Sequence, residues 1–308
     1  MKILILGANG FIGKYYKKFT KLDKLFLTSS KKKNNYIHYN LIDHDIEKVL
    51  SKYKITHVVF FAAISKPEDC QKDIKLSQLI NVIKTKKVIN QLIKKNIYFI
   101  FLSSDYIFNG KKGNYLEGSK PDPMVLYGKQ KLNIENFLKK NKNKNFSIMR
   151  CPKTYGDEIN DKSIFTSFLR ECLKNKKKFV IANDQIFTAL YVKDLIKVID
   201  IFLNKKITGK FNVCGDESFS RFSYFNKIIR YFKFDNIEMT GKQLKYLSDV
   251  KNIPLNVSMN NIKLKKKINY KFTKFSHYLN IIFKKYPKNM QKNSKNTKKT
   301  NFLKLKKN

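Results

Sequence analysis

Short apolar runs alternate with segments in which apolar residues recur at helical spacing. The runs are rich in β-branched, aliphatic and aromatic side chains, which is typical of buried strands. They occupy residues 2–6, 24–28, 36–40, 56–63, 98–102, 146–149, 179–182 and 210–214. Helical spacing occurs at 79–93, 127–138, 164–173 and 222–232. Through the first half of the chain this alternation predicts an α/β fold with a doubly wound parallel sheet.

A glycine-rich turn follows the first strand directly. It has the sequence Gly-Ala-Asn-Gly-Phe-Ile-Gly, the pattern G-x-x-G-x-x-G, and leads into a helical stretch. Glycines permit the tight turn and let the backbone approach a pyrophosphate, which rests against free N–H groups at the positive end of the helix. A tight turn that binds nothing is the alternative. The predicted cofactor-binding residues here are Gly7, Asn9, Gly10, Phe11, Ile12 and Gly13.

The ends of the second and fourth strands extend this prediction. After the second strand the chain continues Ser-Ser-Lys-Lys-Lys, where an NAD site carries an acidic residue to hold the ribose hydroxyls. Hydroxyls and cations suit a 2′-phosphate instead. Ser29, Ser30 and Lys31 therefore predict NADPH as the cofactor, with NADH as the alternative. Ala62 and Ala63 end the fourth strand and leave room for a nucleotide to lie close to it.

Candidate chemistry lies at the end of the fifth strand and the start of the next helix. Ser103 and Ser104 follow the buried run at 98–102, at the strand end where open α/β sheets bind ligands. Tyr127 and Lys131 are four residues apart, so they share one face of a helix. A nearby ammonium stabilises a phenolate, so we expect Lys131 to lower the pKa of Tyr127. Because lysine is abundant here, a solvated helix face is the alternative interpretation of this pair.

Composition and charge narrow the possible partners. The 308 residues carry a net charge of +42, yet all but four of the 65 basic residues are lysine, spread over the whole chain. Readout of phosphates and bases usually recruits arginine, so we interpret the charge as a compositional bias and predict no specific nucleic-acid partner. The excess charge should still attract anionic ligands over long range.

The cysteines and the lengths of the apolar runs indicate where in the cell the protein works. The four cysteines lie far apart without a C-x-x-C pair or histidines at metal spacing, so we expect neither a disulfide framework nor a metal site. Reduced thiols indicate a cytoplasmic protein. Apolar runs fall short of the about 20 residues that cross a bilayer, so no membrane span and no signal peptide are expected. Residues 286–308 are rich in Lys, Asn and Thr, which predicts a disordered basic tail.

Together these motifs resemble an extended short-chain dehydrogenase/reductase, and the finer sequence is similar to the dTDP-4-dehydrorhamnose reductase branch. The resemblance covers residues 1–283. Its most specific part is Ser-Ser-Asp-Tyr-Ile-Phe-Asn-Gly at 103–110, because most epimerases and dehydratases of the superfamily differ there. Further matching stretches are Pro-Asp-Pro at 121–123, Tyr-Gly-Lys-Gln-Lys at 127–131, and residues 150–156, 184–185, 191–195 and 211–215.

The resemblance implies a role for each residue of the site. Tyr127 would protonate a sugar carbonyl while NADPH delivers hydride, and Lys131 would hold the nicotinamide ribose. Ser104 would hydrogen-bond the substrate carbonyl. Asn81 would support the lysine through water, although a buried asparagine with structural partners is the alternative. The implied substrate-binding residues are Ser104, Asp105, Tyr106 and Lys153.

The resemblance also implies the architecture and the reaction. We expect a Rossmann domain at 1–155, continued by about 183–210, a smaller C-terminal α/β substrate-binding lobe within 156–285, and the tail. The implied reaction is reduction of the 4-keto group of a nucleotide-activated deoxysugar, for surface polysaccharide biosynthesis. A nucleotide-sugar epimerase or dehydratase with bound NAD, and a non-catalytic NAD(P)-binding subunit, are the alternatives. The nucleotide sugar is the expected partner, and a homodimer stays open.

Three places depart from the branch: Asn40, where an Asp is common, the stretch 62–64, which replaces a more polar version, and Lys153. Lys153 stands where rhamnose-type reductases usually carry an aromatic residue that packs against the sugar. A cation there favours a more acidic or differently substituted substrate. The identity of the sugar is therefore the least determined part of this prediction.

Overall fold

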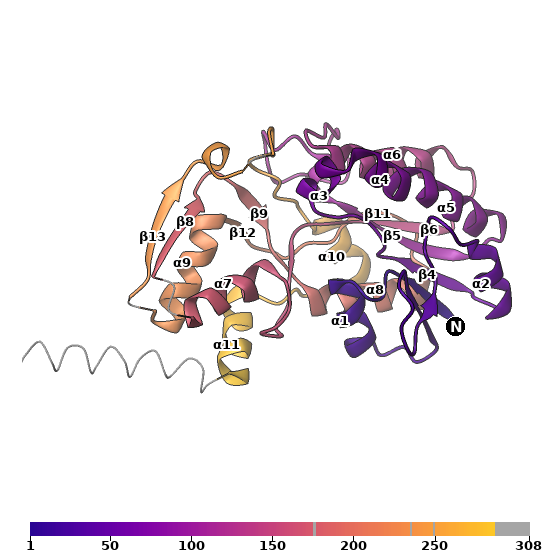
Figure 1. The fold of residues 1–308 in the computed structure, drawn as a ribbon, viewed down its shortest axis with the longest axis horizontal. Coiled ribbons are helices and arrows are strands. Elements are labelled where there is room, and N and C mark those ends of the chain that lie inside the picture. Colours follow the sequence, from indigo (N-terminus) through magenta and orange to yellow (C-terminus); the bar gives the residue numbers. More distant parts are fainter. Residues whose placement is uncertain (175–176, 235, 249, 287–308) are drawn as a thin grey trace, which may run out of the picture.

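A parallel sheet forms the centre of the larger lobe in the computed structural model, which describes residues 1–174, 177–234, 236–248 and 250–286 (Figure 1). Within these residues the sheet has seven strands in the order β11-β6-β5-β4-β1-β2-β3, and each adjacent pair is parallel. The strands are β1 Ile3–Leu6, β2 Leu25–Ser29, β3 Ile37–His38, β4 His57–Phe60, β5 Tyr98–Ser104, β6 Phe146–Cys151 and β11 Gly209–Asn212. The order is that of a doubly wound Rossmann sheet, which confirms the predicted fold class.

Helices cover both faces of this sheet because successive strand side chains point to opposite sides. Val58 and Phe60 pack toward one face, whereas Val59 packs toward the other. The first face is covered by α2 (Ile46–Lys52), α5 (Thr85–Lys94) and α6 (Leu126–Lys140). The second is covered by α1 (Phe11–Phe19) and α8 (Val192–Lys205), on the lower side of the sheet in Figure 1. The expected helix at 79–93 begins with a π-helical turn, Leu79–Lys84, before α5.

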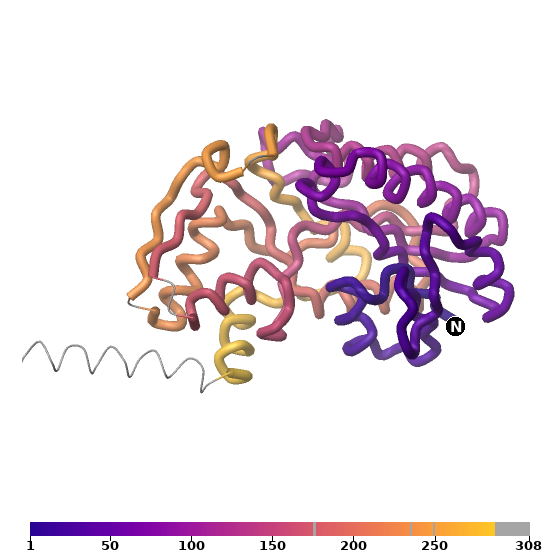
Figure 2. Tube along the Cα trace, in the orientation of Figure 1, coloured from indigo at the N-terminus to yellow at the C-terminus, as the bar shows by residue number. Residues whose placement is uncertain are grey.

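The smaller lobe is built from short strand pairs packed on helices. β8 (Lys178–Ala182) pairs with β13 (Glu238–Lys242), and β9 (Ile186–Thr188) pairs with β12 (Ser218–Ser220). The helices of this region are α7 Ile164–Leu173, α9 Arg221–Phe232 and α11 Phe275–Lys285. Figure 2 shows the chain crossing between the lobes more than once, so the smaller lobe is discontinuous in sequence.

The remaining elements join these two parts. They are α3 Pro67–Lys72, α4 Ile74–Gln78, the 3₁₀ turns Asp105–Ile107 and Leu244–Tyr246, β7 Thr154–Tyr155, β10 Leu190–Tyr191 and α10 Ile262–Ile268. β7 and β10 pair in parallel where the chain leaves and re-enters the large lobe. The division at residue 155 and the return at about 183–210 stay predictions; β11 extends the large sheet to Asn212.

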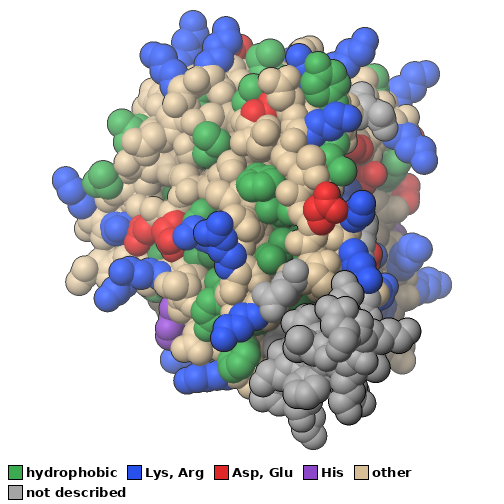
Figure 3. Space-filling model, turned by 90° about the vertical axis from the view of Figure 1, so that its left-hand side faces the viewer, with side chains coloured by type: hydrophobic (Ala, Val, Ile, Leu, Met, Phe, Trp, Pro, Cys, Tyr) green, Lys and Arg blue, Asp and Glu red, His purple; other side chains and the backbone are tan. Residues whose placement is uncertain are grey.

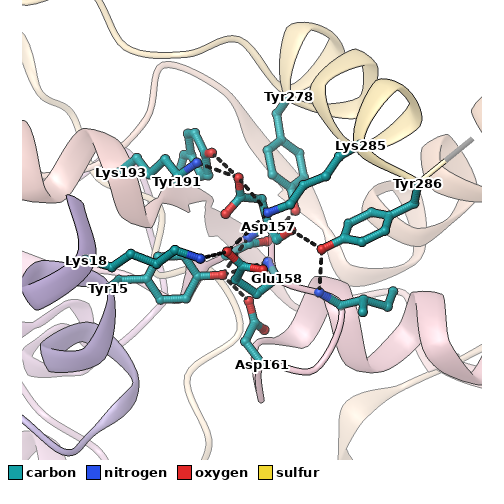
Figure 4. Close-up of polar contacts among 12 residues, drawn as sticks. Tyr15, Lys18, Asp157, Glu158, Asp161, Tyr191, Lys193, Tyr278, Lys285 and Tyr286 are labelled. Atoms are coloured by element: carbon teal, nitrogen blue, oxygen red, sulfur yellow. Dashed lines mark hydrogen bonds and ion pairs between the residues drawn. The ribbon is translucent and has the colours of Figure 1, made fainter.

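A buried carboxylate holds the lobes together (Figure 4). Asp157 Oδ2 accepts a hydrogen bond from Lys193 Nζ at 2.6 Å and one from the Tyr191 hydroxyl at 3.0 Å. Lys285 Nζ, at the end of α11, lies 3.7 Å from the same oxygen. Two ammonium groups and a phenol from distant segments therefore converge on one oxygen.

Tyr15 of α1 extends this cluster into the large lobe (Figure 4). Its hydroxyl donates to Asp161 Oδ2 at 2.7 Å and accepts from the backbone N–H groups of Asp157 and Glu158. The Tyr286 hydroxyl donates to the Asp157 carbonyl at 3.2 Å. Tyr286 is the first residue of the predicted tail; residues 287–308 lie outside the described residues.

Basic side chains do not gather in one stripe on the face seen in Figure 3. Lysine and arginine are spread around this end of the smaller lobe, with apolar and acidic side chains between them. This distribution agrees with a compositional bias, and the absence of a specific nucleic-acid partner stays a prediction. In the part of the chain that the structure describes, no helix is long and apolar enough to cross a membrane.

Candidate active site

The glycine turn lies close to the backbone that follows β4. Gly7 has φ +84°, and a Cβ there would lie 2.7 Å from the backbone nitrogen of Ala62. A Cβ at Gly13 would lie 2.6 Å from the Cα atom of Ala8. Gly10 precedes the first residue of α1 and supplies no side-chain cap, so backbone N–H groups at the helix start remain available to a ligand. The turn thus has the form of a phosphate cradle.

One cavity of about 580 Å³ joins this turn to the end of β5. It contains residues from both predicted sets, cofactor-binding and catalytic. Its predicted members are Gly7, Gly10, Phe11, Ile12, Gly13, Ala63, Ser104, Asp105, Tyr106, Tyr127, Lys131 and Lys153. Residues from segments up to 146 positions apart therefore share one space, as the parallel sheet requires when strand ends meet at one edge.

Other predicted cofactor residues lie outside this cavity. They are Asn9, Ser29, Ser30, Lys31 and Ala62. Ser29 is buried at the end of β2, whereas Ser30 and Lys31 are exposed.

Sequence reasoning missed a cation beside the turn. Lys33 Nζ donates to the Asn9 side-chain oxygen at 3.3 Å and lies 5.1 Å from the centre of the Tyr36 ring. The run of three lysines was the available signal, but only tertiary contact shows which one reaches the glycine turn.

Ser104 organises the chain where β5 ends. Its hydroxyl accepts from the Tyr106 backbone N–H at 3.2 Å and donates to Asp105 Oδ1 at 2.9 Å. Burial raises the pKa of Asp105 to about 6, although this hydrogen bond and the charge of Lys153 oppose the shift. A proton on Asp105 would let that carboxyl donate to Ser104, which would free the serine proton for a ligand.

Gly128 fixes the distance between this turn and α6. A Cβ at Gly128 would collide with the carbonyl oxygen of Tyr106, so only glycine permits the close approach. The preceding residue, Tyr127, consequently packs edge-on against Tyr106, with ring centres 6.4 Å apart. The packing therefore holds the phenol beside Ser104 and Asp105.

Tyr127 and Lys131 share one helix face as expected, but their electrostatics differ from the expectation. Lys131 Nζ lies 5.7 Å from the centre of the Tyr127 ring and donates to the Leu102 carbonyl at 2.7 Å. Burial raises the pKa of Tyr127, and the charge of Asp105 raises it further. Burial lowers the pKa of Lys131 to about 8. The predicted lowering of the Tyr127 pKa is wrong here, because desolvation outweighs the distant ammonium. The phenol stays protonated.

Asn81 lies in the π-helical turn and has several polar contacts. Its side-chain oxygen accepts from the Ile64 N–H at 2.9 Å, and its amide donates to the Ile64 carbonyl at 2.9 Å. The amide also donates to Gln130 Oε1 at 2.8 Å. These contacts fasten the loop after β4 to α6, one residue before Lys131. They favour the structural role, and the water-mediated relay stays a prediction.

A buried ion pair underlies the cavity, and sequence reasoning missed it. Arg150 is fully buried, and its Nε and Nη2 atoms donate to both oxygens of Glu135, the shortest distance being 2.6 Å. The Ser103 hydroxyl donates to Glu135 Oε1 at 2.6 Å, and Arg150 Nη1 donates to the Glu117 carbonyl at 3.2 Å. Because Glu135 lies one turn after Lys131 and Ser103 precedes Ser104, the pair connects both parts of the site.

Lys153 contributes a half-buried cation to the cavity wall. Burial lowers its pKa to about 7, and the charge of Arg221, the first residue of α9, lowers it further. Asp105 and Glu68 act in the opposite direction. Arg221 has a lowered pKa for the same reason, burial. No signal in the sequence connected Arg221 with this site.

Comparison with known proteins identifies the family of this chain and structures that share its fold. Residues 1–287 match the family described as RmlD substrate binding domain. The chain belongs to this family. Its fold is shared with dTDP-4-dehydrorhamnose reductase from Bacillus anthracis in complex with NADP, at a TM-score of 0.80 and 23% identity, over 92% of this chain and 100% of that chain. The Clostridium acetobutylicum reductase has the same TM-score and identity, over 94% and 100%.

Two relatives of this RmlD-family chain differ in the function that their names state. Methionine adenosyltransferase 2 subunit beta of Xenopus tropicalis is 28% identical over 232 residues, 72% of this chain and 69% of that protein. The spore coat polysaccharide biosynthesis protein SpsK of Bacillus subtilis is 26% identical over 200 residues, 64% and 68%. The family membership confirms the predicted resemblance, whereas these names leave the activity to be tested.

The RmlD-family chain also contains four free, buried cysteines. Cys151 lines the cavity, and burial raises the pKa of its thiol. Across the described ranges, no group of His, Cys, Asp and Glu side chains is arranged to hold a metal ion.

Proposed function

We propose that this protein is an NADPH-dependent reductase of the 4-keto group of a nucleotide-activated deoxysugar. The observation that carries the proposal is the single cavity that joins the glycine turn to Ser104, Tyr127 and Lys131. A side chain at Gly7 or Gly13 would collide with neighbouring backbone atoms, so these glycines permit the tight turn that a cofactor pyrophosphate requires. The NADP complex of the Bacillus anthracis structure supports this assignment.

Each residue has a task in the proposed reaction. NADPH, when bound, supplies the hydride that reduces the carbonyl carbon. Tyr127, protonated because burial raises its pKa, donates its phenolic proton to the carbonyl oxygen. Ser104 hydrogen-bonds the same oxygen and orients it. Lys131, with a pKa lowered to about 8, holds the ribose and can pass a proton back to the phenolate.

The cofactor's 2′-phosphate would lie near the basic edge of the turn. Lys33 already contacts Asn9, and Lys31 and Ser30 are exposed beside it. The negative charge of the 2′-phosphate would be stabilised by charge-assisted hydrogen bonds from these side chains. NADPH is therefore proposed over NADH.

We further propose a role in surface polysaccharide biosynthesis and a cytoplasmic location. The name of the Bacillus subtilis relative supports the pathway, and the free thiols support the compartment. A homodimer is proposed as the assembly to be tested.

A second candidate is a non-catalytic NAD(P)-binding subunit. The similarity to methionine adenosyltransferase 2 subunit beta favours it. A binding subunit needs no proton donor, so the arrangement of Ser104, Tyr127 and Lys131 in one cavity favours the reductase. An epimerase or dehydratase would use the same residues without net oxidation of NADPH.

The decisive measurement is NADPH oxidation with a panel of nucleotide-linked 4-keto-6-deoxy sugars generated in situ. We expect stoichiometric oxidation with at least one sugar and a loss of about 10²-fold or more in kcat for Tyr127→Phe, because the general acid is removed. Tyr224→Phe is the matched control, since its buried hydroxyl, in α9 of the smaller lobe, has no hydrogen-bond partner among the described residues. Retention of more than about a tenth of activity in Tyr127→Phe contradicts the mechanism. Tight NADPH binding without oxidation of any sugar supports the binding subunit.

A further inference from the structure

Lys153 lies in the cavity wall, and the positive charge of Arg221, the first residue of α9, acts on it. In the described part of the chain, neither side chain forms an ion pair. The Nε atom of Arg221 is buried and has no hydrogen-bond partner. Buried donors without partners are rare and costly, so the Arg221 Nε–H can donate to an acceptor on a ligand.

We propose that Lys153 and Arg221 form a subsite for a carboxylate on the sugar ring of the substrate. The inference rests on the proposed function, because it names the substrate class for that cavity. An ammonium and a guanidinium together match a carboxylate, which accepts several charge-assisted hydrogen bonds in one plane.

Two acidic groups act on Lys153. Asp105, in the turn after β5, already accepts the Ser104 proton, and burial raises its pKa to about 6. Glu68, in α3, lines the same cavity and is exposed to solvent. Arg221 adds a second positive charge from α9. Below pH 7 both Lys153 and Arg221 are charged, and in the described structure neither carboxylate forms an ion pair with them.

The reacting end of the cavity argues for the sugar over the diphosphate. Lys153 shares the cavity with Ser104 and Tyr127, between which the carbonyl must lie. The charge of Asp105, hydrogen-bonded to Ser104, acts on Lys153. An anion held by Lys153 is thus near the reduced carbon, where a ring substituent lies and the diphosphate does not.

The test uses two stable ligands that differ at one group. UDP-glucuronate and UDP-glucose share nucleotide and diphosphate, and only the first has a sugar carboxylate. Each ligand is titrated into the full chain saturated with NADP⁺, and its affinity is measured by isothermal titration calorimetry. The corresponding dTDP-glucuronate and dTDP-glucose are measured in the same way. We expect the carboxylate sugar to bind about tenfold or more tightly than its neutral partner, since charged hydrogen bonds contribute that much.

Variants separate the subsite from general charge. Lys153→Met should bind the carboxylate sugar and the neutral sugar with about equal affinity, while its affinity for the neutral sugar stays within about threefold of the wild-type value. Arg221→Met should reduce the preference for the carboxylate sugar only in part. Lys129→Met removes the same charge from an exposed position of α6 and should leave the preference unchanged. The wild-type preference should also fall as pH rises through the range in which Lys153 loses its proton.

The outcomes are distinct. No wild-type preference, or no binding of either acidic sugar, overturns the subsite. Equal weakening of both ligands in Lys153→Met also overturns it and assigns the cations to the diphosphate. Because binding needs no turnover, a preserved preference without NADPH oxidation would contradict the proposed reaction and retain the subsite.

Discussion

Two groups of cations lie close to the same cavity, one fully buried and the other partly exposed, and they differ in how their charge is met. Arg150 is fully buried beneath the site, with both oxygens of Glu135 and the Glu117 carbonyl as acceptors. Lys153 and Arg221, in the cavity region, have no ion-pair partner in the described structure. The chain thus neutralises the cation that holds its elements together, and it leaves Lys153, which lines the cavity, without an ion-pair partner among the described residues.

The physical reason is desolvation. A buried charge must recover its lost hydration from hydrogen bonds and an opposite charge, and it destabilises the fold when it does not. Arg150 recovers it inside the protein, whereas burial lowers the pKa of Lys153. The Asp157 cluster is intermediate, because its carboxylate is buried but its lysine partners are partly exposed (Figure 4).

Breaking the fully compensated pair should have the largest effect on stability. Arg150→Met leaves Glu135 buried without its partner, so we expect the free energy of unfolding to fall by about 3–5 kcal/mol. Urea unfolding at pH 7 measures this loss. Lys95→Met, which removes the exposed Glu47–Lys95 pair, is the control and should cost less than about 1 kcal/mol. A loss in Arg150→Met no greater than in this control would refute the distinction between the two regions.

The intermediate cluster should show an intermediate effect. Asp157→Asn removes the charge shared by Lys193 and Lys285, and partial exposure of both lysines reduces the cost to about 1–3 kcal/mol. The same urea titration measures it, and added salt should shrink the difference from wild type because the lysines contact solvent. A difference that is unchanged between low and high salt would show that packing, and not charge, accounts for the loss.

Removing the uncompensated cation should have the smallest effect, and of opposite sign. The folded pKa of Lys153 is about 7, against an ordinary value of 10.5. Between these pH values the unfolded chain holds the proton and the folded chain does not, so this group makes stability rise with pH. Lys153→Met should abolish that slope and stabilise the protein near pH 7 by about 1–2 kcal/mol, discounted for partial exposure.

The measurement for Lys153 is urea unfolding of wild type and Lys153→Met at pH 7 and pH 9.5. Comparing the two proteins cancels the titration of other lysines. Lys129→Met should show no pH-dependent difference from wild type. A destabilised Lys153→Met at pH 7 would show that the ammonium is compensated after all.

Local sequence determined the parallel sheet and much of the site. Strand and helix signals depend on neighbouring residues, so their alternation predicted the observed sheet, the glycine turn and the helix that carries Tyr127 and Lys131. The spacing of four residues placed these two side chains on one face. The basic run after β2 was recognised, although Lys33, and not Lys31, contacts the turn.

Only the tertiary structure decided what depends on burial and on distant segments. The direction of the Tyr127 pKa shift came from desolvation by surrounding elements, which outweighs the local lysine. The charge of Arg221 acts on Lys153 although the two residues are 68 positions apart, one after β6 and the other at the start of α9. Neither the depth of burial nor a remote partner's charge is encoded in a short window of sequence. The pKa shifts of the site residues could therefore be obtained only from the folded structure, because desolvation and Coulomb energy both depend on three-dimensional distance.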